Sequence, residues 1–271
     1  MESSTNNPPR ALAAGFCCID VYEDLNLSYP TGNGVDWAVH LQRMGIPTGL
    51  LSVVGTDPDG TVMKNTLQAE GIDISHLHTA EGETCKMRMA LKNGVDRVHL
   101  EEIEGVMKDF SLTDDDRSYI NKFQFIHMDL FGNMLSELPA LGQSDLQVVM
   151  DFSTFTDDPQ YCRDEYFSHV NYAFLSYEQE DAYIRGRLRK IQSYGPKVVT
   201  ATFGEKGSLS YDGSQFYREP IVPAKVVNTV GAGDSYIAGF TYGIMQGWDI
   251  PACMRKGAQV SAQVVSKFKP Y

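Results

Sequence analysis

The sequence of 271 residues has few cysteines, few basic residues relative to acidic ones, and no long apolar run. Its five cysteines include no CxxC pair and its six histidines do not cluster with them, which leaves a zinc site without support. We therefore expect free thiols in a reducing compartment and no metal held by side chains. No apolar run approaches the ~18–20 residues of a membrane span. A formal charge of −12 disfavours binding to nucleic-acid backbones.

The first ten residues, MESSTNNPPR, are polar and contain two prolines. They lack the apolar segment of a secretion signal. We predict a flexible tail over residues 1–10, a single domain over residues 11–271, and a cytoplasmic location.

Strands and helices alternate along most of the chain, which predicts an α/β fold with a parallel sheet. A first strand is expected over 11–21, and a helix over 36–44 ends before Gly45 and Pro47. The later expected elements are strands at 50–54, 123–128, 147–152, 172–175 and 197–203, a helix at 61–70, a hairpin at 208–217, and helices opening near 233 and 251.

One segment interrupts this alternation. Residues 85–91 and 95–100 alternate polar and apolar side chains on either side of Asn93-Gly94, which is a strong hairpin signal. A hairpin has no place inside a parallel sheet, so we expect a small separate lid sheet. Its strands should come from about 21–30 and 84–103.

The strongest local signal is the segment from Asn228 to Asp234, NTVGAGD, which precedes a run of small residues. Small side chains at a helix start let an anion approach free backbone N–H groups. Asp234 lies beside them and could accept a proton from an attacking hydroxyl. An Asp-capped helix start with tight packing is the alternative explanation.

Two further glycine-rich elements are present. The segment 202–207, TFGEKG, follows a predicted strand and could bind a ligand there, or could be a plain turn. The segment 31–36, TGNGVD, could bind sugar hydroxyls through Asn33 and Asp36, although Asp36 could be only a helix cap. Neither a P-loop nor a dinucleotide fingerprint is present, since Trp37 stands where the fingerprint needs Gly or Ala.

In order and spacing, these elements resemble the ribokinase, or PfkB, family of carbohydrate kinases from about residue 11 onward. The quoted segments are Gly32-Asn33, Val54-Gly55-Thr56-Asp57 with Gly60, Gly71-Ile72-Asp73, 202–207 and Thr229–Asp234. Within the family the chain looks most like the fructoselysine 6-kinases, which phosphorylate fructose–amino-acid adducts. That closer likeness rests on Asp20-Val21-Tyr22, Ser75-His76-Leu77-His78-Thr79, 104–110, 178–181 and 231–235.

The resemblance implies a three-layer α/β/α core with a β-sheet lid, and ATP with Mg²⁺ as the phosphate donor. It makes Asp234 the general base, and assigns an anion hole to the amides of Gly231, Ala232 and Gly233. The ATP site would include Thr202, Gly204, Gly207 and Glu180, with Glu180 acting on magnesium through water. The sugar would face Asp20, Gly32, Asn33, Asp36 and Arg97, although Arg97 could instead be a solvated lid residue.

Several positions depart from the family pattern: Phe16, Thr31, Asp36, Tyr177 and Asn228. Asn228 replaces an acidic residue, which leaves the need for a monovalent cation open. Asp36 replaces an asparagine, and its charge could favour the cationic amine of a fructosamine.

The leading prediction is an ATP-dependent kinase that phosphorylates the primary hydroxyl of a fructosamine. The alternatives are a kinase for another ketose or a nucleoside, and a non-catalytic binding protein of the same fold. The edge of the lid could also pair two copies into a homodimer.

Overall fold

The computed structural model describes residues 10–93 and 96–271. Residues 1–9 of the predicted tail, and Gly94 of the predicted hairpin turn, lie outside the described residues.

The larger of two sheets has its strands in the order β13-β12-β11-β10-β9-β8-β1-β4-β5. Strands β11, β10, β9, β8, β1, β4 and β5 pair in parallel, and β12 and β13 extend the sheet as an antiparallel hairpin. Its strands are β1 (Ala11–Ala14), β4 (Thr48–Gly55), β5 (Leu77–Ala80), β8 (Phe125–Met128), β9 (Gln147–Asp151), β10 (Tyr172–Ser176), β11 (Val198–Thr202), β12 (Ser208–Tyr211) and β13 (Phe216–Glu219).

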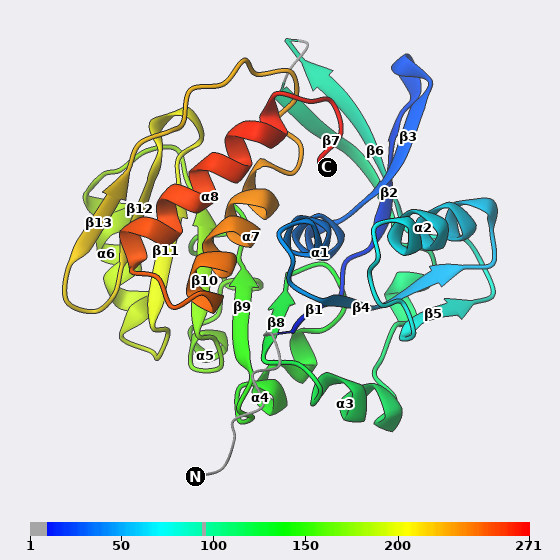
Figure 1. Cartoon of the computed structure of the whole chain (residues 1–271), viewed down its shortest axis with the longest axis horizontal. Coiled ribbons are helices and arrows are strands. Elements are labelled where there is room, and N and C mark those ends of the chain that lie inside the picture. The colour runs from blue at the N-terminus through cyan, green and yellow to red at the C-terminus, as the bar shows by residue number, and fades with distance from the viewer. Residues whose placement is uncertain (1–9, 94–95) are drawn as a thin grey trace.

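Helices flank this sheet, with α1, α7 and α8 in front of the strands and α6 behind them in Figure 1. The helices are α1 (Asn33–Arg43), α2 (Pro58–Ala69), α3 (Asp114–Ile120), α4 (Leu138–Leu141), α5 (Asp164–Phe167), α6 (Ala182–Gln192), α7 (Ala232–Met245) and α8 (Ile250–Val265). Short 3-10 helices cover Glu23–Leu25, Gly105–Asp109, Leu135–Glu137 and Gly204–Lys206. The predicted α/β class is confirmed.

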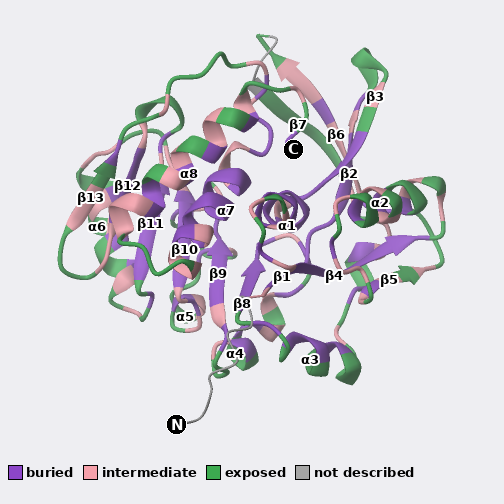
Figure 2. Cartoon of the chain, viewed as in Figure 1, coloured by how far each residue is buried: buried purple, intermediate pink, exposed green. Residues whose placement is uncertain are grey.

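Helix α1 lies at the centre of the molecule, because it packs on β1, β4 and β8 and also against α7. Eight of its eleven residues are buried, and the coil is mostly purple in Figure 2. Trp37 is fully buried, and its ring stacks on the imidazole of His127 at 5.1 Å between centroids. The indole N–H of Trp37 donates to the hydroxyl of Thr241 at 3.4 Å, which ties α1 to α7 as well.

The second sheet has the order β3-β2-β6-β7. Its strands are β2 (Cys18–Tyr22), β3 (Leu27–Thr31), β6 (Lys86–Lys92) and β7 (Asp96–Ile103). The outer pairs are antiparallel hairpins, and β2 pairs with β6 in parallel. We call these four strands the lid sheet.

The predicted first strand over 11–21 was wrong, because the structure divides it between the two sheets. β1 ends at Ala14 in the core, and β2 begins at Cys18 in the lid sheet. Gly15 makes the turn with φ +121°, and a Cβ there would lie 3.2 Å from Gly132 Cα. The apolar run is continuous because both halves are buried, so hydrophobicity alone did not reveal the break.

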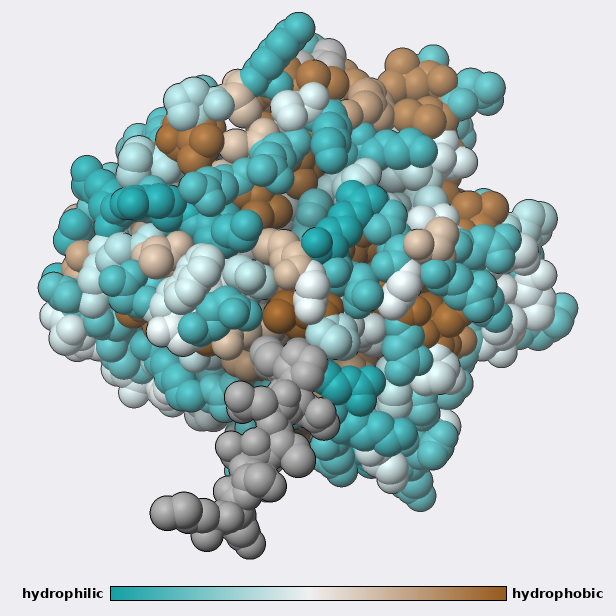
Figure 3. Space-filling model, viewed as in Figure 1, coloured by the Kyte–Doolittle hydropathy of each residue, from teal (hydrophilic) through white to brown (hydrophobic). Residues whose placement is uncertain are grey.

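Among the described residues, no helix combines the length and apolarity needed to cross a membrane. Figure 3 shows one face of the molecule, on which hydrophobic residues occur in separate small groups among hydrophilic ones.

Candidate active site

A cavity of about 490 Å³ lies between the lid sheet and the carboxyl ends of core strands. Ligands of open α/β sheets bind at this edge. The lid sheet and α1 contribute Cys18, Asp20, Thr31, Gly32, Asn33, Asp36, Met87, Arg97, His99, Leu100, Glu101 and Glu102. The remaining lining residues are Phe16, Phe131, Ser153, Thr154, Phe155, Val230 and Asp234. The structure thus brings all five predicted sugar-facing residues to one cavity with Asp234.

Asp234 lies in the first turn of α7 and is only 6% exposed. The side-chain amide of Asn33 donates to Asp234 Oδ1 at 2.9 Å and to Asp151 Oδ2 at 3.2 Å. Burial, and then the negative charge of Asp151, raise the pKa of Asp234 to about 7. A carboxylate with this pKa, at the wall of a cavity, is suited to accept a proton near neutral pH.

Sequence reasoning missed two buried carboxylates beside Asp234. Asp151 ends β9, and Asp129 follows β8, where it accepts backbone N–H groups of Phe131 and Gly132 at 2.8 and 3.0 Å. Burial raises the pKa of Asp129 to about 6 and raises that of Asp151 as well. The available signal was an acidic residue at the end of each of two neighbouring apolar strands, whose carboxyl ends meet at one edge of the sheet.

Asp36 is nearly fully buried, and it accepts the hydroxyl of Thr31 at 2.9 Å. Its Oδ2 would lie 3.1 Å from a Cβ at Gly231, so this carboxyl faces the start of α7. Burial, and then repulsion from Asp234, raise the pKa of Asp36 well above its ordinary value. Asp20, on β2 of the lid sheet, has its pKa raised by burial to about 7, against the opposing charge of Arg97.

The three residues predicted to form an anion hole, Gly231, Ala232 and Gly233, lie at the start of α7. Gly231 is the N-cap in the left-handed region with φ +69°, where a Cβ would meet Pro270 at 2.5 Å. Ala232 is the first helical residue, and its N–H donates to the Thr229 carbonyl at 3.3 Å, so this amide of the predicted anion hole is already engaged. A Cβ on Gly233 would meet no atom within 4 Å, so the space on the side-chain side of this residue is open. An N–H at this helical position has no intrahelical partner and can face an anion.

The segment 202–207 lies next to α7. Thr202 ends β11, and Gly204 has φ +56° with no atom within 4 Å of an added Cβ. Gly207 has φ +89°, and a Cβ there would lie 2.3 Å from the Glu219 carbonyl oxygen. The hydroxyl of the following Ser208 lies 2.9 Å from that of Tyr236, which ties this segment to α7. Neither Thr202 nor the two glycines line the cavity that holds Asp234.

Glu180 forms ion pairs with two arginines, Arg185 at 2.6 Å and Arg218. Burial opposes ionisation, but the hydrogen bonds from Arg218 and Arg185 hold the pKa of Glu180 below its ordinary value. Its carboxylate is therefore already engaged by cationic groups and is not presented as a direct metal ligand.

Asn228 is fully buried ahead of the helix start. Its Nδ2 donates to the Phe268 carbonyl at 3.0 Å, and its Oδ1 accepts the N–H of Val230 at 3.0 Å. The side-chain amide thus supplies a neutral cross-link between the segment before α7 and the segment after α8.

Comparison with known proteins identifies the class of this protein. The model of the pfkB family of carbohydrate kinases matches residues 27–271. The chain belongs to this family and is an ATP-dependent sugar kinase, as its resemblance predicted.

Three individual proteins show what the chain is similar to in sequence and in fold. The chain is 36% identical over 251 residues to a fructoselysine 6-kinase of Escherichia coli, covering 93% of this chain and 95% of that protein. It is 30% identical to a fructosamine kinase of Bacillus subtilis, covering 94% and 90%. An Arabidopsis thaliana ribokinase solved with ribose and ATP has the same fold, with a TM-score of 0.82 at 18% identity over 96% of this chain and 94% of that one.

The family implies ATP, and usually a divalent metal, so we asked whether these residues fit them. The open backbone at Gly233, and at Gly204 on the neighbouring segment, fits an approaching phosphate chain. Glu180, paired with two arginines, does not fit a direct metal ligand. A divalent ion held mainly by nucleotide phosphates is consistent with both observations.

Proposed function

We propose that this kinase transfers the γ-phosphoryl group of Mg-ATP to the primary hydroxyl of a fructose–amino-acid adduct such as fructoselysine. The relatives of 36% and 30% identity, whose names state fructoselysine and fructosamine, support this substrate class. The charge of the cavity supports it independently.

The acidic lining of the cavity carries the proposal. Among the described lining residues, the acidic ones outnumber the single arginine, Arg97: they are Asp20, Asp36, Glu101, Glu102 and Asp234. Glu101 is already paired with Arg88 at 2.7 Å, and burial raises the pKa of the three aspartates, so an arriving cation would also favour their ionised forms. A fructosamine carries a cationic secondary amine, which such a lining attracts, whereas a neutral ketose has no corresponding charge.

Asp20 is better placed than Asp36 to receive that amine. It lies on the lid sheet, whereas Asp36 faces the start of α7 and already accepts the Thr31 hydroxyl. An arriving cation also favours the ionised form of Asp20, whose pKa of about 7 lets it charge at little cost.

The proposed reaction begins with Asp234 removing the proton of the primary hydroxyl. The hydroxyl oxygen then bonds to the γ-phosphorus as the bond between this phosphorus and the bridging oxygen of ADP breaks. The N–H groups at the start of α7 would stabilise the charge on the transferred group. Asn33 holds Asp234 in position through its 2.9 Å hydrogen bond.

The lid sheet has a second proposed role as a dimer surface. On its edge strand β7, the side chains of Leu100 and Val98 are 62% and 37% exposed. An exposed edge of this kind can pair with a second copy. Sedimentation of the wild type and of the Leu100→Lys variant would test this.

The substrate test uses Mg-ATP and measures ADP release with fructoselysine, fructose-asparagine, fructose, ribose and adenosine. A fructoselysine analogue with an ether oxygen in place of the secondary amine is the charge control. We expect the highest kcat/KM for a fructosamine, with a loss of at least about 10-fold for the ether. Equal rates for the amine and the ether would contradict the charge argument. A preference for ribose or adenosine would identify another sugar kinase or a nucleoside kinase, respectively. No turnover would favour a binding protein or a substrate outside this panel.

A further inference from the structure

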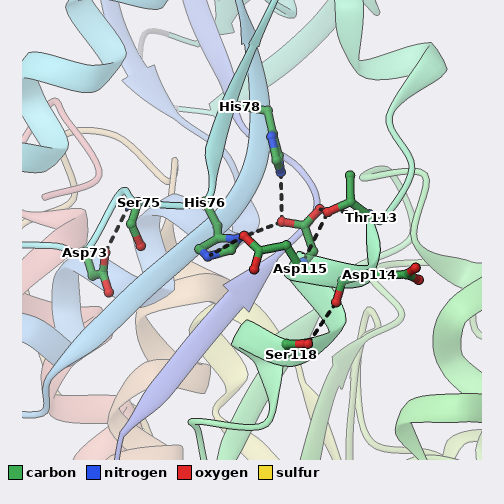
Figure 4. Close-up of polar contacts among 9 residues, drawn as sticks. Asp73, Ser75, His76, His78, Thr113, Asp114, Asp115 and Ser118 are labelled. Atoms are coloured by element: carbon green, nitrogen blue, oxygen red, sulfur yellow. Dashed lines mark hydrogen bonds and ion pairs between the residues drawn. The ribbon is translucent and has the colours of Figure 1, made fainter.

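A cluster of two histidines and one aspartate lies outside the cavity, beside the edge strand β5. His76 Nδ1 lies 2.7 Å, and His78 Nε2 2.8 Å, from the same oxygen of Asp116, Oδ1. In Figure 4 a dashed line leaves each of the His76 and His78 imidazoles toward the segment that carries Thr113 and Asp115. The three ligand atoms lie within 4.8 Å of one another. Nothing in the proposed kinase reaction uses these residues.

We propose that His76, His78 and Asp116 form a binding site for a divalent transition-metal ion, best matched by Zn²⁺. Two imidazole nitrogens and one carboxylate oxygen are a ligand set that zinc accepts, whereas magnesium and calcium prefer oxygen ligands throughout. Water would complete a tetrahedral site on the open side, where the His78 side chain is 38% exposed.

The distances from Asp116 Oδ1 to the two imidazole nitrogens are close to those between neighbouring ligands of a zinc site. Bonds of about 2.0–2.1 Å in a tetrahedron place neighbouring ligand atoms roughly 3.3 Å apart. The two contacts of 2.7 and 2.8 Å would therefore widen by about 0.5–0.6 Å as a metal replaces the shared protons. The exposure of His78 leaves room for this small movement.

The surrounding residues already hold the ligands in the required orientation. The backbone N–H and hydroxyl of Thr113 donate to the other oxygen, Asp116 Oδ2, at 2.9 and 2.7 Å, which leaves Oδ1 for the site. The His76 ring stacks on Tyr119 at 3.8 Å, and its second nitrogen lies 3.9 Å from Asp115 Oδ2. Outer carboxylates and hydrogen bonds of this kind orient the ligands of metal sites.

The position of the cluster gives the metal a structural consequence. His78 and Asp116 are separated by 38 residues, and the chain between them contains β6 and β7 of the lid sheet. A bound ion would cross-link the two ends of the segment between His78 and Asp116. It would thereby stabilise the core at the points where this segment leaves it and returns to it.

The test uses tag-free protein stripped with a chelator and then titrated with Zn²⁺ by calorimetry, with metal content measured after dialysis. His78→Gln and Asp116→Asn are the site variants, and His169→Gln is the matched control, because His169 lies outside the cluster and the cavity. We expect one Zn²⁺ per wild-type chain and per control chain, and at least about 10-fold weaker binding in both site variants. Zn²⁺ should raise the melting temperature of the wild type and not of His78→Gln.

Co²⁺ serves as a spectroscopic probe, since a tetrahedral nitrogen–oxygen site should give visible absorption in the wild type that His78→Gln lacks. Absence of stoichiometric Zn²⁺ binding to the wild type would overturn the proposal. Unchanged binding in His78→Gln would do the same, and this partly exposed position keeps the test valid if Asp116→Asn does not fold.

Discussion

The side-chain amide of Asn33 donates a 2.9 Å hydrogen bond to Asp234, which joins the first turn of α1 to the first turn of α7. The same amide donates to Asp151 at 3.2 Å, so it bridges two buried carboxyl groups. Asn33 therefore positions the proposed base and lowers its pKa, although burial and the charge of Asp151 have larger effects on that pKa.

Removing this amide should alter the pH dependence of the reaction. In Asn33→Ala, Asp234 loses a donor that favours its ionised form, so its pKa should rise above about 7 and kcat/KM should decline at a higher pH than in the wild type. The loss of a hydrogen bond to a charged group should also lower the maximal rate by roughly 10–100-fold. A pH–rate profile measures both effects, and Asn33→Asp should move the acidic limb further. If the acidic limb of the pH–rate profile moves in neither variant, Asn33 does not influence the pKa of the base.

Asp234→Asn should be nearly inactive and yet more stable than the wild type at pH 8. Loss of a general base should lower kcat by about 100–10,000-fold. The folded-state pKa of about 7 exceeds the ordinary 3.8, so the wild type loses stability as pH rises between these values, and the full cost remains above pH 7.

Asparagine at position 234 cannot ionise, so it removes the loss of folding stability that the buried Asp234 carboxylate causes. We place this loss on the order of 1–3 kcal/mol at pH 8. Urea unfolding at pH 5 and pH 8 measures it, with the exposed Asp145→Asn as control. A variant with full activity, or one destabilised at pH 8, would contradict the assignment.

Gly233→Ala should impair ATP use without harming the fold. An added Cβ meets no atom within 4 Å, and alanine is favoured over glycine within a helix by about 1 kcal/mol. The methyl group would occupy the space proposed for phosphate, so KM for ATP should rise at least about 10-fold while the melting temperature holds or increases. Gly186→Ala on α6 is the matched control, because its Cβ position is equally open and lies on a different helix. Equal KM values for ATP in the two variants would contradict the placement of the phosphate at the start of α7.

Asp20→Asn should reduce the use of fructoselysine more than that of fructose. The substitution keeps the shape of the side chain and removes the charge proposed to pair with the amine, so the ratio of the two kcat/KM values should fall at least about 10-fold. Asp36→Asn tests the competing assignment in parallel. If only Asp36→Asn changes the ratio, the amine lies beside α7 instead of beside the lid sheet.

The wild-type rate should not depend on potassium, because the Asn228 amide already donates to the Phe268 carbonyl. Rates measured in potassium, sodium and tetramethylammonium chloride at equal ionic strength should agree within about 2-fold. Such agreement is expected when none of these cations favours one conformation of the enzyme over another. Asn228→Asp removes the donor and buries a carboxylate, so this variant should become stabilised or activated by a monovalent cation. Strong activation of the wild type by potassium would contradict the neutral cross-link.

The sequence predicted the α/β alternation and the lid hairpin because their signals are local. Periodicity and glycine stops place α1 and α2 near their observed bounds, and Asn93-Gly94 marks the hairpin. Helix α6 was not predicted, although its buried residues Ile184, Leu188 and Ile191 have helical spacing.

Only part of the site could be predicted, because motifs are local in sequence whereas contacts between distant residues depend on the fold. Glycine-rich segments and Asp234 form a recognisable motif, but Asp129 and Asp151 gain significance only when β8 and β9 lie side by side. The His76–His78–Asp116 cluster is likewise invisible in sequence, because its third member is 40 residues from the first. The ion pairs that engage Glu180 also depend on tertiary packing.

β1 lies inside the larger sheet, between β4 and β8, and this position imposes an order on how the chain can acquire its structure during synthesis. Leu12 pairs with Gly49 on one side and with Ile126 on the other, so this early strand must wait for β8 to emerge before both of its edges are satisfied. Asn33 must wait longer still, since Asp234 follows it by 201 residues. The nascent protein should thus hold exposed backbone edges through much of translation, and chaperone dependence should be greatest before β8 is released.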